Sequence, residues 1–131
     1  MSVRAIAKNV RISPRKVSLV ASLVRNRSVD DAIAILEYTP KKAAIAVKKT
    51  ILSAKANAVT NHNYLAKDLK ITQISVTPGR ALKRYRPVAR GSAHPFKRKS
   101  SHIYVLIDGI TRPAKTNKTE SKDTKSEKKD Q

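Results

Sequence analysis

Residues 79–102 decide how this chain folds, and their sequence is GRALKRYRPVARGSAHPFKRKSSH. The stretch holds eight Lys or Arg and no acid, and it lies between two apolar segments typical of strands, 69–78 and 103–107. If those strands pair antiparallel, the insert must be a long hairpin that folds back near Arg90-Gly91-Ser92. The sequence therefore predicts two neighbouring strands joined by a basic arm.

The predicted arm is long compared with the rest of the chain. About ten residues per strand, at about 3.3 Å each, reach roughly 30 Å, whereas a folded body of about 100 residues has a radius of gyration of about 13 Å. A lone two-stranded hairpin is at best marginally stable in water, and an ordinary solvated loop needs neither this length nor this one-sided charge. We therefore expect an anionic partner to support the arm.

The segment before the arm predicts the rest of an α+β body. A first strand is expected at Val3–Ile12, although Ile6 shares its alternating set with Arg4 and Lys8, and a strand with one clean face would not mix them. The complete expected fold is α+β, with three helices, a small antiparallel sheet and a long protruding β-hairpin.

The first two helices are expected to start at serines. Ser13 can cap the first helix, with Pro14 at its first position. Ser28 can cap the second, where Asp30 and Asp31 favour the helix dipole.

The third helix is expected to start at Thr39-Pro40 and to end at about Asn61. Two ridges at helical spacing predict contacts on two of its sides. The first ridge is Ala44, Val47, Ile51, Ala54 and Ala58, and the second is Ile45, Leu52 and Val59. A third series, Lys41, Lys48 and Lys55, fits equally well a solvated face or a contact with a partner.

Composition limits the functions that the chain can have. Its 131 residues make one ordinary domain, and its formal net charge of +20 favours a polyanionic partner. It has no Cys, no apolar run long enough to span a membrane, and no apolar signal-peptide core. We expect a cytoplasmic protein without a membrane partner. Residues 1–112 are predicted to form one domain that includes the hairpin 79–102, and residues 113–131 a disordered Lys-rich tail.

No set of residues suggests catalysis or a metal. His62, His94 and His102 show no metal-ligand spacing and have no carboxylate near them in the sequence. We therefore expect no enzyme activity, no metal and no cofactor, and assign the histidines structural or RNA-contact roles.

Two features favour recognition of a nucleic-acid backbone. Arg15 and Lys16 lie in the first turn of the first helix, where cations oppose the dipole unless a phosphate docks there. This predicts an RNA contact at residues 13–16. Only four Tyr, one Phe and no Trp are present, which favours backbone and shape recognition over readout of unstacked bases.

Three segments resemble one known family: Arg11–Val17 (RISPRKV), Lys55–Ala58 (KANA) and Gly79–His102. Because they occur in this order, the chain, from about Val3 to Ile110, resembles the large-subunit ribosomal protein L-twenty-two family in its bacterial form. The resemblance implies a body on the outer surface of the large subunit near the polypeptide exit, and a hairpin threaded through rRNA to line the exit tunnel. It also implies a role in subunit assembly.

The expected partners are large-subunit (23S) rRNA, neighbouring large-subunit proteins and the nascent polypeptide, with one copy per ribosome and no homo-oligomer. The resemblance places the tunnel tip at Arg90, Gly91, Ser92 and Ala93, and implies that Leu82, Lys83 and Arg84 form the segment whose changes alter the response to macrolides. The residues predicted to contact rRNA are Arg4, Lys8, Arg11, Ser13, Arg15, Lys16, Arg80, Lys83, Arg84, Arg86, Arg90, Arg98, Lys99 and His102. The alternative is a DNA-architectural protein that places a basic β-arm in a groove.

Overall fold

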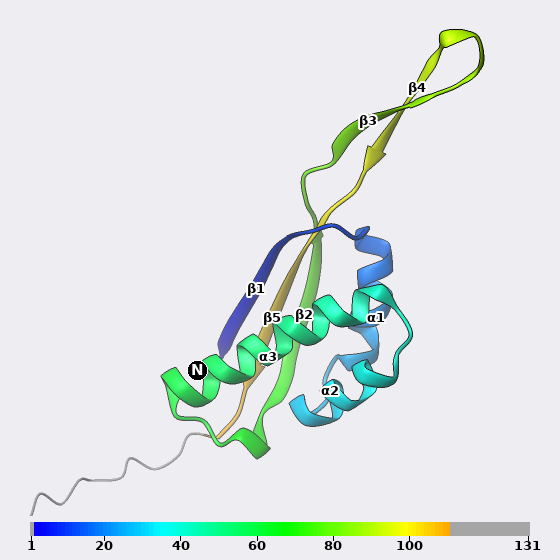
Figure 1. Ribbon diagram of the computed structural model, residues 1–131. Helices are drawn as coiled ribbons and strands as arrows, with labels where there is room; N and C mark the ends of the chain where they lie inside the picture. The colour runs from blue at the N-terminus through cyan, green and yellow to red at the C-terminus, as the bar shows by residue number, and fades with distance from the viewer. Residues whose placement is uncertain (1, 111–131) are drawn as a thin grey trace, which may run out of the picture.

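A long two-stranded arm projects from one end of a body in which helices pack on a sheet (Figure 1). This computed structural model describes residues 2–110, so the predicted tail at 113–131 lies outside the described residues. The elements in chain order are β1 (Val3–Val10), α1 (Pro14–Val24), α2 (Val29–Tyr38), α3 (Lys42–His62), the 3-10 turn η1 (Ala66–Asp68), β2 (Lys70–Pro78), β3 (Leu82–Pro87), the 3-10 turn η2 (Ala89–Gly91), β4 (Ala93–Arg98) and β5 (Ser101–Asp108). The predicted α+β fold with a protruding hairpin is confirmed.

The body sheet has the strand order β1-β5-β2, and both pairings are antiparallel. Ile107 of β5 lies opposite Val3 of β1 and Ile71 of β2, so the three residues share one face. The predicted antiparallel pairing of the strands that flank the arm is therefore confirmed, and the arm continues the β2–β5 hairpin beyond the sheet.

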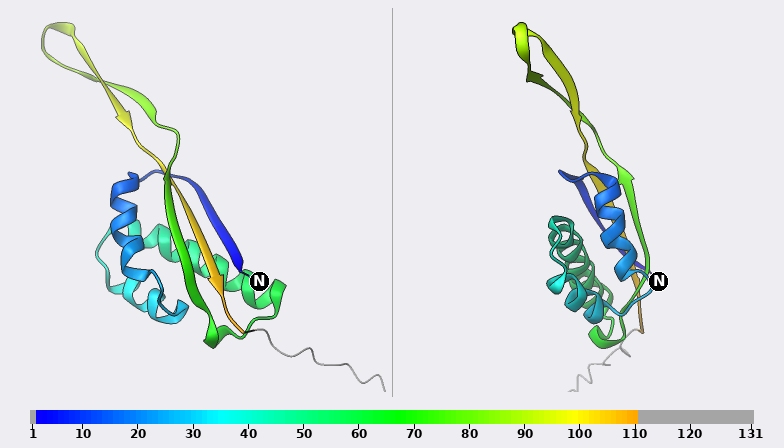
Figure 2. Two further views of the ribbon diagram at one scale, coloured as in Figure 1. Left: turned by 180° about the vertical axis from the view of Figure 1, so that it is seen from behind. Right: turned by 90° about the vertical axis from the view of Figure 1, so that its right-hand side faces the viewer.

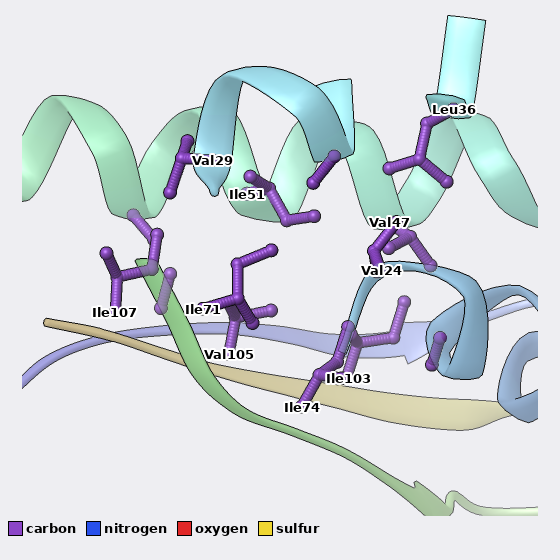
Figure 3. Close-up of a cluster of buried hydrophobic side chains, with 14 of the residues drawn as sticks. Val24, Val29, Leu36, Val47, Ile51, Ile71, Ile74, Ile103, Val105 and Ile107 are labelled. Carbon is purple, nitrogen blue, oxygen red and sulfur yellow. The ribbon is translucent and has the colours of Figure 1, made fainter. Parts of the chain in front are cut away.

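The core lies between that face and the helices. α1 packs on β2, while α3 packs on β1 and β5. Figure 3 shows Val47 and Ile51 of α3 directed toward Ile103 and Val105 of the sheet, and all four are fully buried. Burying a side chain of this size contributes about 1.5–3 kcal/mol. The first ridge of α3 was correctly predicted as core.

The second ridge of α3 does not make the contact that was predicted for it. Ile45 is 61% exposed and Leu52 is 42% exposed, while Val59 is only partly buried. The sheet and α2 both contact α3 on the side of the first ridge. Within residues 2–110, no element covers the other side.

A bulge explains the mixed pattern of the first strand. Asn9 has φ 56°, and the pairing register with β5 shifts between Ala7 and Val10. Before the bulge, the alternate residues Val3 and Ala5 face the core, which leaves Ile6 on the outer face with the cations. The strand ends at Val10, two residues before the predicted end.

The two serine caps differ. Ser28 caps α2 as predicted, because its Oγ accepts a hydrogen bond from the Asp31 amide at 3.2 Å. Ser13 occupies the cap position of α1, but its side chain makes no capping hydrogen bond, so that part of the prediction is wrong.

The third helix starts at Lys42 and not at Thr39-Pro40. The residue before a proline avoids helical geometry, and Thr39 is extended, with φ −83° and ψ 111°. Its hydroxyl donates to the carbonyl of Ile35 at 2.7 Å, so Thr39 ends α2 instead of starting α3.

Candidate nucleic-acid interface

Acids and cations are segregated in the described part of the chain. Its acids are confined to α2, η1 and the end of β5: Asp30, Asp31, Glu37, Asp68 and Asp108. Residues 2–29 and 69–107 contain none. β1, α1, β2 and the whole arm therefore present positive charge without a neighbouring carboxylate of their own.

Ion pairs with α2 engage part of the lysine series on α3. Lys48 Nζ lies 2.6 Å from Glu37 Oε1, and Lys55 pairs with Asp30 Oδ1. These two lysines therefore tie α3 to α2, which supports a structural role for them. Lys41 is exposed at the cap position of α3.

The arm is exposed along its whole length. β3 pairs with β4 from Leu82 opposite Arg98 to Pro87 opposite Ala93, and every residue of both strands is exposed. Among the described residues, no cation of the arm forms an ion pair. Within residues 2–110, the charged groups of the arm make only local side-chain interactions: the Arg86 guanidinium lies 5.8 Å from the Phe96 ring centre, and Arg84 donates to the Lys83 carbonyl.

The predicted turn of the arm is confirmed. Arg90 and Gly91 have φ of 59° and 70°, and the Val88 amide donates to the Ser92 carbonyl at 2.9 Å. Of the four predicted tip residues, three form this turn, and Ala93 begins β4. Arg90 thus adopts the left-handed conformation that is uncommon for non-glycine residues, in the turn at the end of the arm.

A basic hollow of about 600 Å³ lies where the arm joins the body. We call it the neck hollow, and its lining residues are Asn9, Arg11, Arg80, Leu82, Arg84, Arg98, Lys99 and Ser100. Five of these eight are Lys or Arg and none is an acid. The fold thus brings one residue of the N-terminal segment that was predicted to contact rRNA together with four from the arm.

Backbone contacts fix the geometry of the neck. The Gly79 amide donates to the Ser100 carbonyl at 2.9 Å, and the Ser100 hydroxyl donates to the Arg80 carbonyl at 2.7 Å. A Cβ at position 79 would lie 2.5 Å from Ser100 Oγ, so any side chain here would have to displace that hydroxyl. The Asn9 backbone amide donates to His102 Nδ1 at 3.0 Å. His102, which was predicted to contact rRNA, therefore has a role inside the protein.

The start of α1 continues the basic surface. Arg15 and Lys16 are exposed, and the first turn of the helix has no acid. A second hollow is lined by Arg11, Ser13 and Lys16, by apolar residues of α1, and by residues 39–43 at the start of α3, which include Lys41 and Lys42. Because Arg11 lines both hollows, the surface runs without a break from the neck to this helix start.

The other predicted residues lie apart from the neck hollow. Lys83 lies between Leu82 and Arg84 of the hollow but on the alternate face of β3. Arg86 and Arg90 are farther along the arm, while Arg4 and Lys8 are exposed on the outer face of β1. Sequence reasoning missed Asn9 and Ser100, which shape the neck through polar contacts that have no sequence motif. An asparagine inside an expected strand was the one available signal, since Asn tolerates positive φ.

Residues 2–110 contain no group of three His, Cys, Asp or Glu that could hold a metal ion. In the same range, no helix is both long and apolar enough to cross a membrane.

Comparisons with known proteins agree with this geometry. Residues 5–108 match the family described as ribosomal protein L22p/L17e. Large ribosomal subunit protein uL22 of Desulforamulus reducens is 48% identical over 107 residues, which cover 82% of this chain and 95% of that protein. The uL22 proteins of Herpetosiphon aurantiacus (47% over 108 residues; 82% and 96% covered) and Lactobacillus delbrueckii subsp. bulgaricus (45% over 109 residues; 83% and 93% covered) are similarly close.

Proposed function

Because this chain belongs to the ribosomal protein L22p/L17e family, we propose that it is a structural component of the large ribosomal subunit and binds the large-subunit (23S) rRNA. It is a ribosomal protein and not an enzyme. One observation carries the rRNA proposal: the arm has eight cations and no acid, all eight cations are exposed, and within the described residues none of them has an ionic partner.

Phosphate neutralisation is the proposed source of affinity. Each Lys or Arg that contacts a phosphate releases condensed counterions, which favours binding and makes it depend on salt. The neck hollow concentrates five cations where the arm meets the body, so it is the natural first contact for a folded RNA. The arm, a two-stranded hairpin of marginal stability by itself, gains its support from the RNA around it, and this couples its ordering to subunit assembly.

The finer part of the proposal concerns the arm. We infer that it lines the polypeptide exit tunnel of the cytoplasmic ribosome, with its tip at residues 90–93 facing the nascent polypeptide. The body then contacts neighbouring large-subunit proteins, with one copy per ribosome. The length of the arm and the turn at Arg90-Gly91 support this placement, because a slender basic arm can pass between RNA segments that a globular body cannot enter.

Deletion of Leu82–Arg84 tests the tunnel placement. These residues pair with residues 96–98, and none of them belongs to the buried core. Because side chains alternate faces along a strand, removing three residues shifts the pairing by an odd number and reverses the faces of the rest of β3. The body should stay folded while the macrolide response of ribosomes that carry the deletion changes. An unchanged drug response would count against the tunnel placement.

The choice of nucleic acid tests the rRNA proposal itself. Affinity for folded large-subunit rRNA should exceed affinity for duplex DNA at matched salt, because the cations are distributed over both the body and the arm and so fit a folded RNA better than one groove. Salt dependence alone does not decide, since both ligands lose affinity steeply as salt rises. Equal or higher affinity for duplex DNA would favour a DNA-architectural protein instead.

A further inference from the structure

One face of the body sheet is open. α1 and α3 cover only the face that holds the buried residues of β1, β2 and β5, and the view from behind shows the three strands in front with the helices beyond them (Figure 2). Tyr104 lies on the open face of the central strand β5, between Ile6 of β1 and Ser75 of β2. Two residues along β5, Leu106 lies between Arg4 and Gln73 in the same way.

These residues surround a shallow hollow of about 260 Å³. Its floor combines an aromatic ring with two aliphatic side chains, Tyr104 with Ile6 and Leu106. Clefts that enclose a whole small-molecule ligand are larger, about 300–1,000 Å³. The hollow therefore suits one flat group that lies on the sheet.

Hydrogen-bonding groups border the hollow and are free to bind a ligand. The side chains of Arg4, Gln73 and Ser75, and the Tyr104 hydroxyl, have no hydrogen-bond or ionic partner among the described residues. Arg4 pairs with Leu106, so it is a diagonal neighbour of Tyr104 on the adjacent strand. Diagonal neighbours of this kind lie about 7–8 Å apart, a distance that long side chains can bridge. An aromatic floor, an amide, a hydroxyl and a guanidinium together match the parts of one nucleotide.

We propose that the open face of the sheet binds one unstacked base of single-stranded RNA, which stacks on Tyr104 while Arg4 contacts the adjoining phosphate. This inference rests on the proposed rRNA binding and specifies a second mode for it. Sheets that bind single strands use aromatic side chains in this way, and the hydrogen-bonding edge of the base then faces polar neighbours such as Gln73 and Ser75. The small number of aromatic residues in the chain limits this mode to about one base and does not exclude it.

The charge of the open face favours RNA over a protein as its occupant. Lys8 extends the line of Arg4 along β1, and Asp108, at the end of β5 opposite Lys70, is the only acid in the three strands of the sheet. A protein strand would pair at the sheet edge through its backbone, whereas the hollow lies over the central strand. A polyanion with flat aromatic groups fits both features.

The test compares the full chain with its Tyr104→Val and Tyr104→Phe variants in binding to a single-stranded RNA of about 12 nucleotides and to the same strand in a duplex. Both substitutions suit a strand, but only Phe keeps the ring. Fluorescence anisotropy at matched high salt, which suppresses the contribution of the arm, should show that Tyr104→Val weakens single-strand binding by about 5- to 150-fold. Duplex binding should not change, and Tyr104→Phe should bind the single strand like the parent.

A second readout protects the test against a misfolded variant. The parent chain is crosslinked to the same strand carrying 4-thiouridine, and the crosslinked peptide should contain Tyr104. The proposal is overturned if the crosslinks map only to the arm, or if a folded Tyr104→Val variant loses no single-strand affinity or loses single-strand and duplex affinity equally. Incorporation of the parent into large subunits is followed separately, so that failure of stacking is distinguished from failure of the ribosomal proposal.

Discussion

Removing three cations from the neck hollow should flatten the salt dependence of rRNA binding and leave the body folded. The variant is Arg80→Gln/Arg84→Gln/Arg98→Gln, and each position is exposed and lines the hollow. Within the described residues, none of the three forms an ion pair, so their loss should cost less than about 0.5 kcal/mol in the free energy of unfolding.

The expected size follows from the number of phosphate contacts. Each contact contributes about 0.7 to 0.9 to the slope of log affinity against log salt, so three contacts contribute about 2.1 to 2.7. Between about 50 mM and 200 mM salt, the parent chain should therefore lose about 20- to 40-fold more affinity than the variant loses. Filter binding to large-subunit rRNA over a salt series measures this difference directly.

The control carries the same change in net charge elsewhere. Lys49→Gln/Lys67→Gln/Lys70→Gln removes three exposed cations from α3, η1 and β2, outside the neck hollow and outside the second hollow at the start of α1. Its slope should stay close to that of the parent. The reasoning is refuted if both triple variants flatten the slope equally, because net charge and not the neck would then set the affinity, or if the neck variant keeps the parent slope.

Three further predictions concern stability and are measured by urea unfolding. Ile51→Ala should cost about 2–5 kcal/mol because it opens a cavity in the core, whereas Ile45→Ala at the exposed ridge should cost less than about 0.5 kcal/mol; equal costs would contradict the packing of α3. Ser28→Ala should cost about 1 kcal/mol because it removes the cap of α2. Ser13→Ala should cost clearly less, because the Ser13 side chain makes no capping hydrogen bond. A larger cost for Ser13→Ala than for Ser28→Ala would show that the caps are wrongly assigned. Gly79→Ala should cost about 1 kcal/mol, because the added Cβ displaces the Ser100 hydroxyl from its hydrogen bond to the Arg80 carbonyl. An unchanged urea midpoint of unfolding would mean that the neck relaxes to accept the added methyl group.

The sequence was most informative where one local signal determines the structure. Two apolar strands that flank a basic insert with a central glycine allow essentially one arrangement, so the arm and its turn near Arg90-Gly91 were predictable. Ser28 followed by two aspartates likewise predicted the start of α2.

The errors came from tertiary context. The apolar ridge of Ile45 and Leu52 has a clear helical period, but its burial depends on a neighbouring element that the described chain does not supply. The mixed pattern of the first strand could not be resolved before the bulge at Asn9 was seen, because a bulge changes which face each later residue occupies.

The candidate site was predictable as a set of residues but not as a surface. Positive charge in the first 27 residues and in the arm identified the cations. Only the register between distant strands shows that Arg11 meets Arg80 and Arg98 in one hollow, or that Tyr104 lies opposite Ile6 on an open face. Such juxtapositions depend on pairings across most of the chain, which local patterns do not encode.

The most direct test of the account is where the protein sediments in a lysate gradient run at high magnesium after a high-salt wash. We predict that the protein stays with the large ribosomal subunit at one copy per particle, because contacts of the arm and neck buried within folded rRNA resist a wash that removes loosely bound basic proteins. Recovery free at the top of the gradient, or with DNA, would contradict the claim that this chain is an integral component of the large subunit.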